Sequence, residues 1–224
     1  MKKNNFNENS QINKPKIETI AFIGAIIPVV LLNIKNGKAK QGIDIIRENS
    51  TLKKKLIGVS KILEIESYGD ILATTTGGVT AGCAAGVFST HNKKERIAKY
   101  KEGIFEFLNN MIPTTLVAIL EYITRKKNIE SKALKAIGIL TSVAGGMYLA
   151  NKSSSVINHN IFDKDSNEIK YRKFKLGDVF VHIDDLISLL VLTKVPFAKK
   201  LQVDKILPFL YAKTGYEAGC AKEL

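Results

Sequence analysis

The stretch ILATTTGGVTAGCAAGVFSTHN, residues 71–92, decides the fold class because it holds no charged side chain when its one histidine is neutral. Within it Gly78, Gly82 and Gly86 recur at every fourth position. On a helix these glycines share one face and let the backbone of a neighbouring helix come close. A bilayer core requires about 20 helical residues. The stretch therefore predicts a membrane-embedded helix, around which the other helices gather.

The same stretch also suits a soluble protein. Thr74, Thr75, Thr76, Thr80 and the pair Gly77-Gly78 make it only weakly apolar, and glycine disfavours an isolated helix. A glycine-rich loop leading into a short buried helix is therefore the alternative. A phosphate-binding loop is excluded, because the stretch has no Lys or Arg and lacks the required GK[ST] spacing.

The charges cluster in the connections between long uncharged runs. The 224 residues carry 34 Lys and Arg against 21 Asp and Glu, a net charge of +13. Uncharged sequence occupies residues 19–34, 71–92, 107–120 and 136–151. The pattern predicts an all-α protein, a helical bundle of about four membrane-embedded helices plus amphipathic C-terminal helices.

Four segments follow from this pattern. They are a disordered basic tail (1–16), the membrane-embedded bundle (17–152), a polar connection (153–176) and amphipathic C-terminal helices (177–224). The basic tail before an apolar run resembles a secretory signal, but no small-x-small cleavage site follows it. We therefore expect an uncleaved first helix. The last helix is expected over residues 199–213, broken at Pro208 and lying on the bundle or on the membrane surface.

A lysine run at residues 53–55 precedes Leu56, Val59 and Leu63, which is the spacing of an amphipathic helix. Such a helix either docks on a soluble core or lies on a membrane with its lysines toward anionic lipid. Anionic lipid head groups are thus the expected partners. Nucleic acid is not expected, because the basic segments lack interleaved aromatic residues.

The apolar runs show an internal similarity. Pro28 and Pro113 lie in similar apolar contexts. An Ile-Leu dipeptide also stands six residues before each of two Gly-Gly pairs, at residues 77–78 and 145–146. Coincidence is one explanation, since apolar helices share few residue types. The other is a duplicated helical hairpin around a pseudo-two-fold axis, as in many transporters.

Chemistry is suggested by one constellation, Asp178, His182 and Asp185, which share a helix face. These groups can bind a divalent metal or relay a proton, but acids after a glycine also cap a helix and favour its dipole. No catalytic motif and no cofactor are expected. Glu106 and Glu121 stand at the ends of an uncharged run, where they are expected to reach head groups.

Counting basic residues predicts the orientation. Four spans with a cytoplasmic N-terminus place 21 Lys and Arg inside and 13 outside, which favours this arrangement in the cell membrane. Five basic residues in a short outside loop oppose it. Runs that return on the same side, or a soluble protein with a basic surface, remain as explanations.

Three functional hypotheses result, and the motifs are too generic to indicate a family. The first is a non-enzymatic membrane protein with a structural or assembly role, forming homo-oligomers through Gly78, Gly82 and Gly86. The second is a small-solute or ion transporter whose path is lined by Asn109, Asn110 and threonines. The third is a soluble basic α-helical protein.

Overall fold

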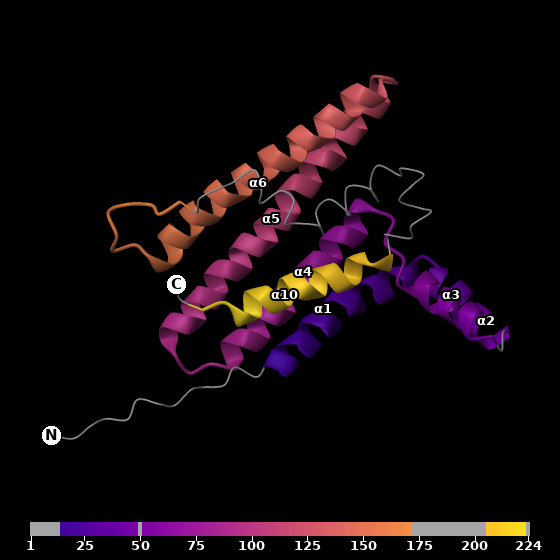
Figure 1. Ribbon diagram of the computed structural model, residues 1–224, viewed down its shortest axis with the longest axis horizontal. Helices are drawn as coiled ribbons and strands as arrows, with labels where there is room; N and C mark the ends of the chain where they lie inside the picture. The colour runs from indigo at the N-terminus through magenta and orange to yellow at the C-terminus, as the bar shows by residue number, and fades with distance from the viewer. Residues whose placement is uncertain (1–13, 49–50, 172–204, 223–224) are drawn as a thin grey trace.

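The computed structural model describes residues 14–48, 51–171 and 205–222, which fold as helices joined by short connections (Figure 1). No strand occurs within these ranges, so the predicted all-α class is confirmed. The helices are α1 (Lys14–Lys35), α2 (Lys38–Glu48), α3 (Leu52–Ile62), α4 (Tyr68–Phe88), α5 (Lys93–Lys126), α6 (Lys132–Phe162) and α10 (Leu207–Cys220).

Four of these helices, α1, α4, α5 and α6, are long and apolar enough to cross a membrane. They coincide with the four uncharged runs of the sequence. α5 and α6 are longer than their runs, with 34 and 31 residues, because charged and polar residues continue the helix beyond the apolar part. α6 therefore extends past residue 152, into the segment expected to be a polar connection.

Helix α4 packs against both α1 and α10, which also contact each other, and glycine makes both contacts of α4 very close (Figure 1). A Cβ atom on Gly77 would lie 2.8 Å from Pro28 Cγ of α1 and would also collide with the backbone of that helix. On the adjacent face, a Cβ on Gly78 would lie 2.7 Å from the carbonyl oxygen of Tyr211 in α10. Side chains at either position would separate the helices.

The other two glycines of the predicted face also meet α10. A Cβ on Gly82 would collide with the carbonyl oxygen of Gly215, and one on Gly86 with that of Gly219. Because residue numbers rise together along the contact, α10 runs parallel to α4. The face formed by Gly78, Gly82 and Gly86 is therefore packed against a helix of the same chain.

The sequence prediction for α10 needs correction. The helix begins at Leu207, with Pro208 in its first turn, where the missing N–H costs nothing, and it runs on through Gly215 to Cys220. It does not break at Pro208. Leu207 and Tyr211 are fully buried, which shows that α10 packs into the bundle. It can do so because its glycines fit against those of α4.

Helices α5 and α6 pack as an antiparallel pair, as α1 and α4 do. A Cβ on Gly146 would lie 2.5 Å from Pro113 Cα, as a Cβ on Gly77 would lie close to Pro28. In each of the two helix pairs, a proline of the first helix packs against one of the two adjacent glycines of the second helix: Pro28 against Gly77, and Pro113 against Gly146. This agrees with the internal similarity in the sequence, although a duplication stays a prediction.

Between α1 and α4 the chain forms a small hairpin, α2–α3. A Cβ on Gly42 would lie 2.6 Å from the carbonyl oxygen of Gly58 and 2.6 Å from Ile62 Cγ1. A Cβ on Gly58 would lie 2.6 Å from the carbonyl oxygen of Gly42 and 2.6 Å from Ile46 Cγ1. The two helices are thus related by an approximate two-fold axis. In the view of Figure 1 the hairpin runs crosswise to α1.

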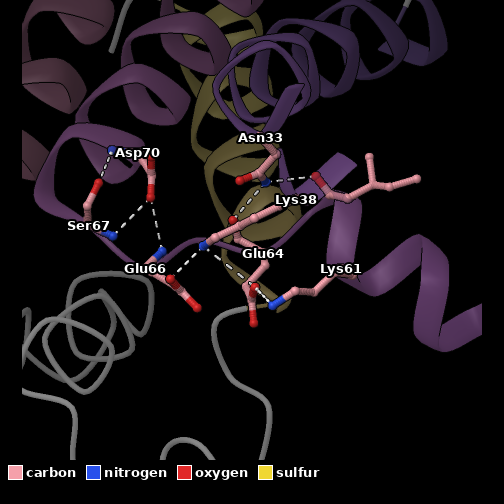
Figure 2. A network of polar contacts seen from close by, with 8 residues as sticks. Asn33, Lys38, Lys61, Glu64, Glu66, Ser67 and Asp70 are labelled. Carbon is pink, nitrogen blue, oxygen red and sulfur yellow. Dashed lines mark hydrogen bonds and ion pairs between the residues drawn. The ribbon is translucent and has the colours of Figure 1, made fainter. Parts of the chain in front are cut away.

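A polar network joins this hairpin to the bundle (Figure 2). The side chain of Asn33, which is 1% exposed near the end of α1, donates from Nδ2 to the carbonyl oxygens of Ile62 (2.8 Å) and Glu64 (2.9 Å). The carbonyl of Ile62 ends α3 and would otherwise lack an intrahelical partner, and that of Glu64 lies in the connection that follows. Asn33 therefore fixes the end of the hairpin against α1.

Ion pairs and a capping box complete the network. Lys38 Nζ lies 2.5 Å from Glu66 Oε2 and 3.6 Å from Glu64 Oε2. The Asp70 carboxylate accepts the backbone N–H of Ser67 (2.9 Å), and Ser67 Oγ accepts that of Asp70 (3.1 Å). This reciprocal pair starts α4. The hydrogen bond from Lys38 holds the pKa of Glu66 below its ordinary value, outweighing the opposing effect of burial.

We expect Gly82→Leu to undock α10. The added side chain cannot share space with the Gly215 backbone, and overpacking of this kind costs about 1–3 kcal/mol or more. The measurement is the thermal unfolding midpoint of the detergent-solubilised protein, with maleimide labelling of Cys220 in α10. The matched control is Gly145→Leu, since a Cβ there meets nothing within 4 Å. Equal midpoints and labelling rates in the two variants would contradict the packing.

We expect Lys38→Met to raise the pKa of Glu66. The Lys38 ammonium lowers that pKa, so the stabilisation it gives is complete above the ordinary value of 4.5. It is lost as the pH falls through the lower pKa of the folded protein. The measurement is a ¹³C NMR titration of the Glu66 carboxyl carbon. Lys40→Met, outside the network of Figure 2, should leave the titration midpoint unchanged. An unaltered midpoint in Lys38→Met would contradict the pairing.

Candidate functional site

Contacts between α4 and α5 show which residues lie at the same height in the bundle. Tyr68 Oη and Thr115 Oγ1 are 2.7 Å apart, and a Cβ on Gly103 would lie 2.9 Å from Cys83 Sγ. The two helices are antiparallel, so intermediate positions follow by counting. Thr75 of α4 is therefore level with residues 109–110 of α5, within about one turn.

The same reasoning applies to α5 and α6. Pro113 packs on Gly146, and Asn158 Nδ2 donates to the carbonyl oxygen of Lys101 (3.2 Å). Counting along the antiparallel pair places Asn151 of α6 level with residue 108 of α5. Three helices thus bring polar side chains to one height in the bundle.

We call Thr75, Asn110 and Asn151 the polar layer. Thr75 and Asn110 are each 1% exposed and Asn151 is 6% exposed. Their side-chain oxygens, Thr75 Oγ1, Asn110 Oδ1 and Asn151 Oδ1, are buried without a hydrogen-bond partner in the described part of the chain. Buried polar groups are nearly always hydrogen-bonded, so three such oxygens at one height are unusual.

Neighbouring hydroxyl groups behave differently. Thr74 Oγ1 donates to the carbonyl oxygen of Asp70 (2.6 Å), and Thr114 Oγ1 donates to that of Asn110 (2.7 Å). Asn110 Nδ2 donates to the carbonyl oxygen of Glu106 (2.7 Å), which fixes the orientation of the amide and leaves Oδ1 as its open acceptor. The polar layer therefore offers two amide acceptors and one hydroxyl group that can donate or accept.

An ionisable group lies one helical turn from this layer. Glu106 is only 5% exposed, although the sequence predicted that it would reach lipid head groups. Its position on the α6-facing side of α5, four residues before Asn110, explains the difference. Asn109, which the transporter hypothesis placed with Asn110 along a path, is 1% exposed.

The chemistry of the polar layer is that of neutral oxygen ligands. Hydroxyl and amide oxygens accept hydrogen bonds and replace the hydration shell of small cations in membrane proteins. The layer presents one hydroxyl and two amide oxygens, with a carboxylate one turn away. It is suited to a monovalent cation or to a small solute that donates hydrogen bonds.

The site residues proposed from sequence have different outcomes. Gly78, Gly82 and Gly86 pack on α10, which leaves them covered within the chain. Residues Asp178, His182 and Asp185 lie outside the described residues. Within the described ranges, no group of three or more His, Cys, Asp or Glu side chains could hold a metal ion.

Sequence reasoning missed Asn151 and Lys99, and it included Thr75 only among the threonines of the proposed path. Lys99 is fully buried in α5, and its Nζ donates to the carbonyl oxygen of Ala221 (2.8 Å) at the end of α10. This bond holds α10 against α5. The only sequence signal for a buried lysine was that Lys99 falls on the same helix face as the other buried residues of α5. A lysine at the edge of that face and exposed to solvent would have had the same spacing.

Comparison with known proteins does not indicate a function for this chain. No protein-family model matches the chain, and neither a curated protein nor a solved structure matches it. The function of the polar layer is therefore argued from its own residues.

Proposed function

We propose that the protein is an integral membrane protein, crossing the bilayer with α1, α4, α5 and α6, that binds a monovalent cation at the polar layer and lets small ions pass. The observation that carries this proposal is the set of three unpartnered oxygens at one height. Polar residues within apolar helices commonly mark ion or substrate pathways.

The height of the layer can be compared with the uncharged runs. Gly24 of α1 packs on Gly77 of α4, so Thr75 is level with the middle of the uncharged run of α1. Asn110 and Asn151 lie toward one end of the uncharged runs of α5 and α6, residues 107–120 and 136–151. In the proposed arrangement an ion would therefore reach the layer from the nearer membrane surface.

Energetics also favour a ligand. A buried acceptor left without a partner costs about 1–3 kcal/mol, and an apolar residue of the same shape would remove that cost. Three such oxygens lie at about the same height here. A cation bound among them would offset that cost.

A structural role through homo-oligomers is supported less well. That hypothesis needs the face of Gly78, Gly82 and Gly86 to be open to another copy, whereas α10 covers it. The predicted cytoplasmic N-terminus remains a separate proposal, based on the distribution of basic residues.

We expect a monovalent cation to stabilise the protein and Asn110→Leu to abolish the effect. The measurement is the thermal unfolding midpoint in detergent with sodium, potassium or N-methylglucamine chloride at equal ionic strength. At roughly ten times Kd, a bound cation should raise the midpoint by about 3–6 °C. Asn110→Leu should unfold at or above the cation-free wild-type midpoint and show no cation dependence, because it removes an unpartnered acceptor.

The matched control is Asn158→Leu. Asn158 Oδ1 is also buried without a partner, but it lies level with residue 101 of α5, well away from the polar layer. This variant should keep the cation dependence. Radiotracer uptake by proteoliposomes should exceed that by empty vesicles and should fall in Asn110→Leu. Midpoints that are identical in all three salts would contradict binding.

A further inference from the structure

The α2–α3 hairpin exposes a set of large apolar side chains. Leu52 is 72% exposed and Leu56 is 59% exposed, and both lie on α3. Val59 on the same helix and Ile43 on α2 are each nearly half exposed. We call Ile43, Leu52, Leu56 and Val59 the hairpin apolar face.

The two-fold relation of the hairpin places these residues on one side. Gly42 and Gly58 face each other across the axis, and Ile43 and Val59 each follow one of these glycines. In a pair of antiparallel helices related in this way, equivalent positions project to the same side. Leu56 lies about 60° further around α3 than Val59, so it continues this side toward solvent.

Basic residues surround this face. Between Lys38 and Leu63 the chain carries seven basic and two acidic side chains, a net charge of +5. Lys53, Lys54 and Lys55 are exposed; by helix geometry Lys54 projects opposite Leu52 and Val59, whereas Lys53 and Lys55 flank the apolar face. An apolar face flanked by lysines is typical of helices that lie in the surface of an anionic membrane.

The height of the hairpin selects lipid as the partner. Tyr68 begins α4, and its hydroxyl group is hydrogen-bonded to that of Thr115. The polar network that joins the hairpin to the bundle, which we call the joint, therefore lies level with Thr115 of α5. The uncharged run of α5 continues to Leu120, about 7–8 Å further along the helix. By the α5–α6 register, the exposed Ile137 and Leu140 of α6 also lie beyond this level. If these apolar surfaces face lipid, the hairpin lies at the boundary between acyl chains and head groups.

The joint limits the hairpin to a fixed position. Asn33 holds the end of α3, and Lys38 at the start of α2 pairs with Glu66 just before α4 (Figure 2). The hairpin is thus bonded to both α1 and the start of α4. It cannot swing freely into water without breaking these contacts.

We propose that α2–α3 is a membrane-interface hairpin that inserts its apolar face among the acyl chains of anionic phospholipids. Its lysines contact the head-group phosphates. This inference rests on the proposal that the protein spans a membrane. It gives the basic connection between the first two spans a function of its own, namely recognition of anionic lipid.

The test uses the absence of tryptophan from the chain, since Leu56→Trp introduces a single indole. The full chain is placed in nanodiscs at one copy per disc. The lipid is phosphatidylcholine alone or phosphatidylcholine with about 30% phosphatidylglycerol. For the quenching measurement, the lipids carry bromine near the head-group end of the acyl chain. We expect blue-shifted emission and bromine quenching, both stronger with phosphatidylglycerol. Replacing Lys53, Lys54 and Lys55 by Gln should reduce this difference at least about two-fold, as should high salt.

Two control positions make the outcomes distinct. Gln41→Trp precedes Gly42, on the side of α2 away from Ile43, and should emit at long wavelength without quenching. Ile27→Trp, on the exposed side of α1, reports whether the protein is embedded at all.

Quenching of Ile27→Trp but not of Leu56→Trp would overturn the hairpin inference and leave the membrane proposal standing. Quenching of neither would overturn both. Blue-shifted Leu56→Trp emission without bromine quenching would mean that protein covers the face, which also overturns the inference. Equal quenching with and without phosphatidylglycerol would overturn the recognition of anionic lipid.

Discussion

Direct backbone contact along α4 is the constraint on which the rest of the bundle depends. Gly77 meets α1 and Gly78 meets α10, so adjacent residues serve two different neighbours. In lipid, burial of apolar surface gives little drive for association, and close backbone packing supplies dispersion contacts instead. α4 is therefore the shared element of a three-helix unit. α5 joins this unit through Tyr68, Gly103 and the bond from Lys99 to the end of α10.

The two polar regions of the molecule follow opposite rules. In the joint between α1, α3 and α4, donors and acceptors match: Asn33, Lys38 and Asp70 each contact partners that would otherwise be left open. In the polar layer, three side-chain oxygens are buried at one height without a partner in the described part of the chain. Satisfied networks of the first kind favour a single rigid arrangement, whereas the unpartnered oxygens of the second kind are the basis of the proposed cation site.

The sequence predicted the helical class and the four apolar helices because uncharged length is a local property. It also singled out the close-packing face at Gly78, Gly82 and Gly86, but not its partner. α10 was difficult to predict, since Lys213 and Glu217 make it too polar for a span and Pro208 suggested a break. The polar layer was harder still. It arises from the axial register of α4, α5 and α6, and register depends on tertiary contacts such as that of Pro113 with Gly146.

The parallel packing of α10 on α4 has a consequence for the order of assembly. The chain is made from its N-terminus, so residues 207–220 emerge long after α4 has entered its surroundings. Throughout that interval the groove beside Gly82 has no covering helix. Biogenesis must therefore protect an open glycine surface until α10 has been synthesised, and chains released earlier would expose it to mispairing and to quality-control proteases.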